Sequence, residues 1–212
     1  MNFGKAFTFI FEDEQWFDKL LAPVLISIIP IIGTLAFIGY TLRLIKNVVQ
    51  NEPNPLPRME FGEDLGRGFR FFLIGLVYMI PVFLVLVVML IPMSALNNNE
   101  AVGLFGVIVM IIGGLLLLAY SLFLAIFEPI AMANFAVKDT FASGFEWGNF
   151  FKRLGNNFPA WLIVLAGVII AGFISPLGSI LLVIGVVLTS AYSQLMVAHL
   201  TGQAYAASET KQ

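Results

Sequence analysis

Long apolar stretches alternate with short polar ones along the chain. The apolar stretches lie at residues 20–49, 69–93, 101–127, 158–174 and 177–200, and prolines, asparagines or charged residues separate them. About 20 apolar residues are enough to cross a bilayer as one helix. The pattern predicts an all-α, polytopic integral membrane bundle in one domain, residues 1–212, with about five transmembrane or re-entrant segments.

The two ends of the chain follow other patterns. Apolar residues recur near helical spacing in the first part: Phe3, Phe7, Ile10 and Phe17. With Trp16 at the level of the lipid head groups, residues 1–19 are predicted to form an amphipathic interfacial helix. The tail, residues 201–212, is small and polar and is predicted to fray.

Residues 20–49 admit two interpretations. As one helix they would be about 45 Å long, at roughly 1.5 Å per residue, which exceeds a hydrocarbon core of about 30 Å. Pro30 and Gly33 interrupt the stretch near its middle. The segment is either one tilted, kinked span or a re-entrant pair of half-helices that turns at Pro30–Gly33.

The polar connections indicate an orientation. Positive residues gather around residues 50–68 and 130–157: Arg43, Lys46, Arg58, Arg67 and Arg70 at the first, and Lys138, Lys152 and Arg153 at the second. Because cytoplasmic loops carry the excess of Lys and Arg, both connections and the C-terminus are predicted to be cytoplasmic. A full crossing by residues 20–49 would place Lys5 and Lys19 outside, whereas a re-entrant segment keeps the N-terminus inside, as the rule favours.

Composition supports lipid as the solvent for much of the surface. The chain is 59% hydrophobic and 11% charged, against about 25% charged residues in soluble domains. A net charge of −2 gives no indication of nucleic-acid binding, and the absence of cysteine excludes disulfides and thiolate chemistry. The bilayer itself is therefore the first expected partner.

Few residues offer chemistry. Glu128, at the end of an apolar stretch, is a candidate for ion binding or an edge carboxylate paired with Lys or Arg. His199 is the only histidine, which makes a poor metal site and favours a satisfied interfacial residue. Arg43 and Lys46 are candidates for contact with anionic lipid or for topology anchoring. We expect no catalytic residue, no metal and no cofactor other than bound lipid.

A weak internal repeat links two of the apolar stretches. Pro30 is followed by Gly33 and, nine residues after the proline, by Gly39. Pro176 is followed by Gly178 and, again nine residues on, by Gly185. Repeats with broken helices are typical of transporters, and chance matches between glycine-rich apolar stretches are also common.

The order of several residues resembles a known family. The residues that carry this resemblance are Asp13-x-x-Trp16, Gly39-Tyr40, Arg43, Pro55-Leu56-Pro57, Glu60-Phe61-Gly62, Gly68, Tyr78-x-x-Pro81, Glu128-Pro129 and Gly202-Gln203-Ala204-Tyr205. In these the chain resembles the prokaryotic membrane family catalogued as domain of unknown function four-thousand-and-thirteen. The resemblance implies a multi-pass protein of the prokaryotic cytoplasmic membrane and implies no activity.

Two functions from different classes follow from these patterns. The scarcity of ionisable groups in the apolar stretches favours a non-enzymatic accessory, scaffold or lipid-organising protein that associates with other membrane proteins or with itself. The alternative is a small oligomeric transporter or channel that uses broken helices near Pro30 and Pro176, and Glu128. An intramembrane enzyme is the least favoured class, because acids and bases are scarce.

Overall fold

The computed structural model describes residues 1–95 and 100–209, and these fold into helices without a strand, as the sequence predicts. The helices are α1 (Lys5–Glu12), α2 (Trp16–Ser27), α3 (Ile32–Val49), α4 (Phe61–Ala95), α5 (Glu100–Lys138), α6 (Trp147–Asn156), α7 (Phe158–Leu177) and α8 (Leu182–Ala207), with short 3-10 turns η1 (Phe141–Phe145) and η2 (Gly178–Leu181). Within the described residues, four helices are long and apolar enough to cross a membrane: α3, α4, α5 and α7.

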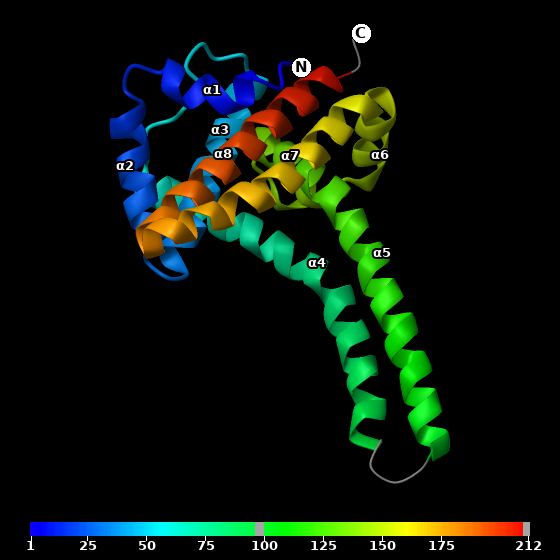
Figure 1. Cartoon of the computed structure of the whole chain (residues 1–212). Helices are drawn as coiled ribbons and strands as arrows, with labels where there is room; N and C mark the ends of the chain where they lie inside the picture. Colours follow the sequence, from blue (N-terminus) through cyan, green and yellow to red (C-terminus); the bar gives the residue numbers. More distant parts are fainter. Residues whose placement is uncertain (96–99, 210–212) are drawn as a thin grey trace. The chain divides into compact units, whose positions relative to one another are not determined.

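The helices form two compact units. The body comprises Met1–Phe72 and Phe127–Gln212, and the α4–α5 hairpin comprises Leu73–Ile126. In the body, α7 and α3 pack along α8, and α1 also contacts α8 (Figure 1). In the hairpin, the Tyr120 hydroxyl donates to the Tyr78 carbonyl oxygen at 2.8 Å, which joins the two helices.

The first apolar segment turns back on itself. α2 ends at Ser27 because Pro30 has no backbone N–H and disfavours helix at the residue before it. Ile31 takes the positive angle φ 64°, and the Ile32 amide donates to the Pro30 carbonyl oxygen at 2.7 Å, which closes a tight turn. The two helices then touch, since a Cβ atom on Gly33 would lie 1.8 Å from the Ile26 carbonyl oxygen. Of the two interpretations left open by the sequence, the paired half-helices are the one observed.

The last two helices make a second hairpin of similar chemistry. α7 runs through Pro176 in its last turn, and η2 leads into α8. A Cβ atom on Gly178 would lie 2.1 Å from the Gly185 carbonyl oxygen, so this turn also depends on a glycine for close approach. Each half of the repeat therefore marks a proline–glycine hairpin turn in the body.

Helices α3 and α4 meet at two glycines. A Cβ atom on Gly39 would lie 1.8 Å from the Asp64 carbonyl oxygen, and one on Gly68 would lie 1.8 Å from the Leu35 carbonyl oxygen. No side chain fits at either place, so the two backbones are in direct contact. The crossing fixes α4 against α3 at the point where α4 begins.

Several predicted boundaries are wrong. The interfacial segment 1–19 is not one helix, because α1 stops at Glu12 and Asp13 is extended. The third apolar helix does not end at Glu128-Pro129, and the tail is helical to Ala207. Both extensions carry buried residues, such as Phe135 and Tyr205, so packing overrides the proline and the polar composition.

A pair of neighbouring glycines tests the crossing of α3 and α4. Gly68→Ala should lower the melting temperature of the purified protein by several degrees, because overpacking costs about 1–3 kcal/mol and here the obstacle is backbone. Gly66→Ala, on the same helix with open space around it, should leave the protein as stable or raise its stability by about 0.5–1 kcal/mol. Thermal unfolding followed by tryptophan fluorescence in detergent measures both. Equal effects would contradict the close crossing.

Candidate functional site

Three groups of polar side chains in the body form the candidate site, and we call them together the polar end: the contacts of Arg43, those of Asn134 and those of Arg153. Arg43 on α3 reaches the start of α4, where its Nε and Nη2 donate to the two carboxylate oxygens of Asp64 at 2.7 and 2.9 Å. Its Nη1 donates to Glu60 at 2.5 Å, and Nη2 also donates to the Arg58 carbonyl oxygen. All three guanidinium nitrogens thus have acceptors. We call this group, Arg43 with Arg58, Glu60 and Asp64, the arginine clasp.

Asp64 also stabilises the start of helix α4, which begins at Phe61. Its carboxylate accepts from the Glu60 amide at 2.8 Å, which satisfies one of the free N–H groups at the helix start. A negative charge in this first turn also suits the helix dipole. Asp64 is fully buried, whereas the prolines before it keep residues 53–60 out of any helix. The clasp therefore sets both where α4 starts and which helix it crosses.

A second polar network joins the end of α5 to α6 and α8. Asn134, fully buried on α5, donates to the Ser143 carbonyl oxygen at 2.8 Å and accepts from the Tyr205 hydroxyl at 2.7 Å. Asn149 on α6 donates to the same Asn134 oxygen at 2.9 Å. Glu146 accepts from Lys138, and this hydrogen bond holds the pKa of Glu146 below its usual value.

The end of α8 is capped by side chains from α6 and from Asn157, the residue that follows α6. Arg153 donates to the Tyr205 carbonyl oxygen at 3.0 Å, and its guanidinium carbon lies 3.4 Å from the centroid of the Tyr205 ring. Asn156 and Asn157 donate to the carbonyl oxygens of Ser208 and Ala207. Since the last carbonyls of a helix have no partners within it, these contacts explain why the tail is ordered through Ala207.

His199 is packed inside the body. Its ring stacks on Phe9 with centroids 4.3 Å apart, and Nδ1 lies 2.9 Å from the Gln203 amide nitrogen. Gln203 in turn exchanges two hydrogen bonds with the backbone of Asn2. Only 3% of His199 is exposed. Its contacts with Phe9 and Gln203 connect α1 to α8. No group of three or more His, Cys, Asp or Glu residues able to hold a metal ion occurs among the described residues.

Glu128 and Lys46 stand apart from these networks. Glu128 is exposed on α5, and among the described residues no hydrogen bond or ion pair reaches its carboxylate. Arg70 on α4 pairs with Asp139 at 2.8 Å. Lys46 is half-buried on α3, one turn from Arg43. The structure therefore does not bring the four candidates of the sequence into one site.

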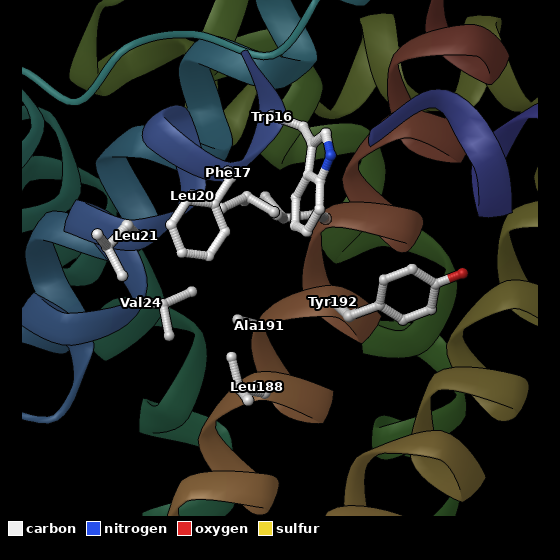
Figure 2. A pocket seen from close by; sticks show the side chains of 9 residues that line it. Trp16, Phe17, Leu20, Leu21, Val24, Leu188, Ala191 and Tyr192 are labelled. Atoms are coloured by element: carbon white, nitrogen blue, oxygen red, sulfur yellow. The ribbon is translucent and has the colours of Figure 1, made fainter. Parts of the chain in front are cut away.

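An apolar pocket of about 110 Å³ lies between α2 and α8 (Figure 2). Trp16, Phe17 and Leu20 line it from α2, and Leu188 and Tyr192 line it from α8. The Tyr192 hydroxyl points away from the pocket and donates to the Phe7 carbonyl oxygen at 2.9 Å. The pocket offers a ligand no charge, and it is smaller than the roughly 300–1,000 Å³ of typical small-molecule sites.

Helices that are long and apolar enough to cross a membrane, with their charged residues in the connections, are the features of a helical membrane protein. The chain belongs to the family described as "Protein of unknown function (DUF4013)", which matches residues 23–188. It is 30% identical over 157 residues to the uncharacterized protein MJ1189 of Methanocaldococcus jannaschii, covering 73% of this chain and 54% of the relative. The chain thus spans about half the length of that relative. No solved structure gives a significant match.

Four of the residues that carry the family resemblance lie close together in the structure. Gly39 and Gly68 make the helix crossing, and Arg43 and Glu60 belong to the clasp. The sequence did not single out Asp64 or Asn134, both of which the structure buries completely. A signal existed for Asn134, because a lone amide within an apolar stretch needs hydrogen-bond partners once it is buried.

Replacing the cation of the clasp tests its role. Arg43→Met should destabilise the protein by about 3–5 kcal/mol, because it leaves the buried Asp64 carboxylate without its counter-ion. Lys46→Met, one turn further along α3, removes the same charge outside the clasp and should change stability by less than about 1 kcal/mol. Denaturant titration in detergent compares the two. If Lys46→Met were the more harmful change, the clasp would not anchor α4.

Proposed function

We propose that this protein is a non-catalytic membrane protein that organises lipids or holds other membrane proteins. The observation that carries the proposal is the set of internal contacts at the polar end: the polar side chains of the arginine clasp, the Asn134 network and the Arg153 cap form hydrogen bonds to other parts of this chain. Such side chains set the shape of a scaffold and leave few groups free to bind or transform a substrate. We further propose the prokaryotic cytoplasmic membrane as its location, with residues 50–68 and 130–157 and the C-terminus on the cytoplasmic side.

The hydroxyl groups of the apolar helices support the same proposal. Ser121 and Ser193 donate to the carbonyl oxygens of Leu118 and Thr189 on their own helices. Ser175 and Ser190 bond to each other across the α7–α8 hairpin at 2.8 Å. These hydroxyls form hydrogen bonds to backbone carbonyls or to each other, and none of these partners is a general base that would activate a nucleophile.

The α4–α5 hairpin supplies an exposed apolar surface for association. Leu84 and Leu115 are more than half exposed, as are many of their neighbours on both helices. Met89 on α4 packs against Gly113 on α5, so the inner faces of the two helices contact each other. Their outer faces are left for lipid or a partner. This surface is where we place the contact with other membrane proteins or a second copy.

A purification in native lipid particles tests the proposal. The protein isolated with its surrounding lipid should carry an enriched lipid class or a partner in fixed proportion, identified by mass spectrometry and crosslinking. Leu84→Ala with Leu115→Ala should reduce retention of a protein partner, because both residues lie on the exposed faces of the hairpin. Leu25→Ala, at an exposed position of α2, is the matched control. A strictly monomeric protein with unselected lipid and no crosslinked partner would refute the proposal.

Two observations favour the alternative, a transporter or channel. Both proline–glycine segments do form breaks between helices, and Glu128 is an exposed carboxylate within an apolar helix. If ions bind Glu128, Glu128→Gln and Glu128→Ala should both reduce ion or proton flux in proteoliposomes, with Glu52→Gln in the polar connection as the control. Unchanged flux in both Glu128 variants would remove the residue from any transport path.

A further inference from the structure

The α2–α3 hairpin is too short on one side to cross a bilayer. α2 has twelve residues, or about 18 Å of helix at 1.5 Å per residue, whereas the hydrocarbon core is about 30 Å thick. The hairpin is closed along its length, because the Tyr40 hydroxyl donates to the Lys19 carbonyl oxygen at 3.3 Å near its base, while Gly33 contacts Ile26 at its tip. The start of α2 and the end of α3 therefore lie at the same end of the body.

The tip of this hairpin is apolar and uncovered. Four isoleucines surround the turn with these exposed fractions: Ile28 51%, Ile29 50%, Ile31 76% and Ile32 48%. Contiguous exposed apolar patches of this kind mark contact with membrane or partner rather than with water. The sequence between α4 and α5, by contrast, is Leu96-Asn97-Asn98-Asn99-Glu100, and its polar composition suits water.

Most backbone amides at the tip are satisfied within the hairpin. Pro30 has no amide hydrogen to satisfy, and the amides of Ile28, Ile29, Ile32 and Gly33 all donate to carbonyl oxygens within the turn. Such internal pairing is required of backbone within hydrocarbon. The arrangement is strained, since a β-branched residue at φ 64° costs on the order of 1–3 kcal/mol.

The base of the hairpin is polar. Lys19 donates to Asp13 at 2.5 Å, and Arg58 donates to Gln15 at 2.7 Å, which ties the start of α2 to the connection after α3. Trp16 stands at this level, as tryptophan does at membrane interfaces. No charged residue occurs between Lys19 and Arg43. Charge therefore falls to zero from the base of the hairpin to its tip.

We infer that the α2–α3 hairpin is re-entrant: its isoleucine tip lies in the hydrocarbon of one leaflet, and residues 1–19 and 50–60 lie on the same side of the membrane. The occupant of the uncovered tip is lipid acyl chain. The length of α2 agrees with this placement, because it is about the thickness of the hydrocarbon in one leaflet. This inference does not rest on the proposed scaffold function, since a transporter with the same hairpin would have the same topology.

Single cysteines test the inference cleanly, because the chain has none of its own. Lys5→Cys and Glu52→Cys are both at exposed positions, and Ile31→Cys lies at the most exposed of the four isoleucines. Each variant is treated with a membrane-impermeant maleimide in intact cells, in permeabilised cells and in detergent. Asn98→Cys, in the polar turn of the sequence, serves as the control for the opposite side.

The re-entrant hairpin has a distinct labelling pattern. Lys5→Cys and Glu52→Cys should react from one side and Asn98→Cys from the other, while Ile31→Cys should react only in detergent. Ile28→Cys repeats the tip measurement if Ile31→Cys does not accumulate. Reaction of Lys5→Cys and Glu52→Cys from opposite sides would overturn the inference. Reaction of either tip cysteine from the aqueous phase of intact or permeabilised cells would also overturn it.

Discussion

The contact between the backbones of α3 and α4 is the constraint on which the body depends. At Gly39 and Gly68 the helices approach so closely that a single methyl group would collide with a carbonyl oxygen. The crossing brings Arg43 within reach of Asp64, so the buried carboxylate and its counter-ion can meet with two hydrogen bonds. Close packing and charge pairing depend on each other here, because a buried carboxylate without its partner would be costly.

Polar side chains also pair across helices in the rest of the polar end. Asn134 reaches three different segments of the chain, and Arg153 closes the end of α8 with a carbonyl contact and an aromatic face. Both residues connect α8 to segments that come earlier in the chain. The outcome is a body in which polar side chains pair across helices and the tip of the α2–α3 hairpin is apolar.

Sequence reasoning identified the helical class, the apolar segments and the break at Pro30, because each is a local property of composition or of proline. It placed helix ends less well. Glu128-Pro129 and the polar tail both looked like ends, yet α5 and α8 continue past them. In each case the missing information was a long-range contact: Phe135 is buried in the body, and Asn156 and Asn157 cap the carbonyls of α8.

By itself, the sequence determined that this protein is built from apolar helices and that its charges gather in the connections, since hydrophobic length and charge position follow directly from residue order. It also singled out Gly39, Arg43, Glu60 and Gly68 through a family resemblance. Only the tertiary structure decided that these residues meet, that Asp64 completes their contact, and that residues 20–49 fold back as a hairpin. Those facts depend on which helices cross, and a crossing is a relation between distant segments that no local pattern contains.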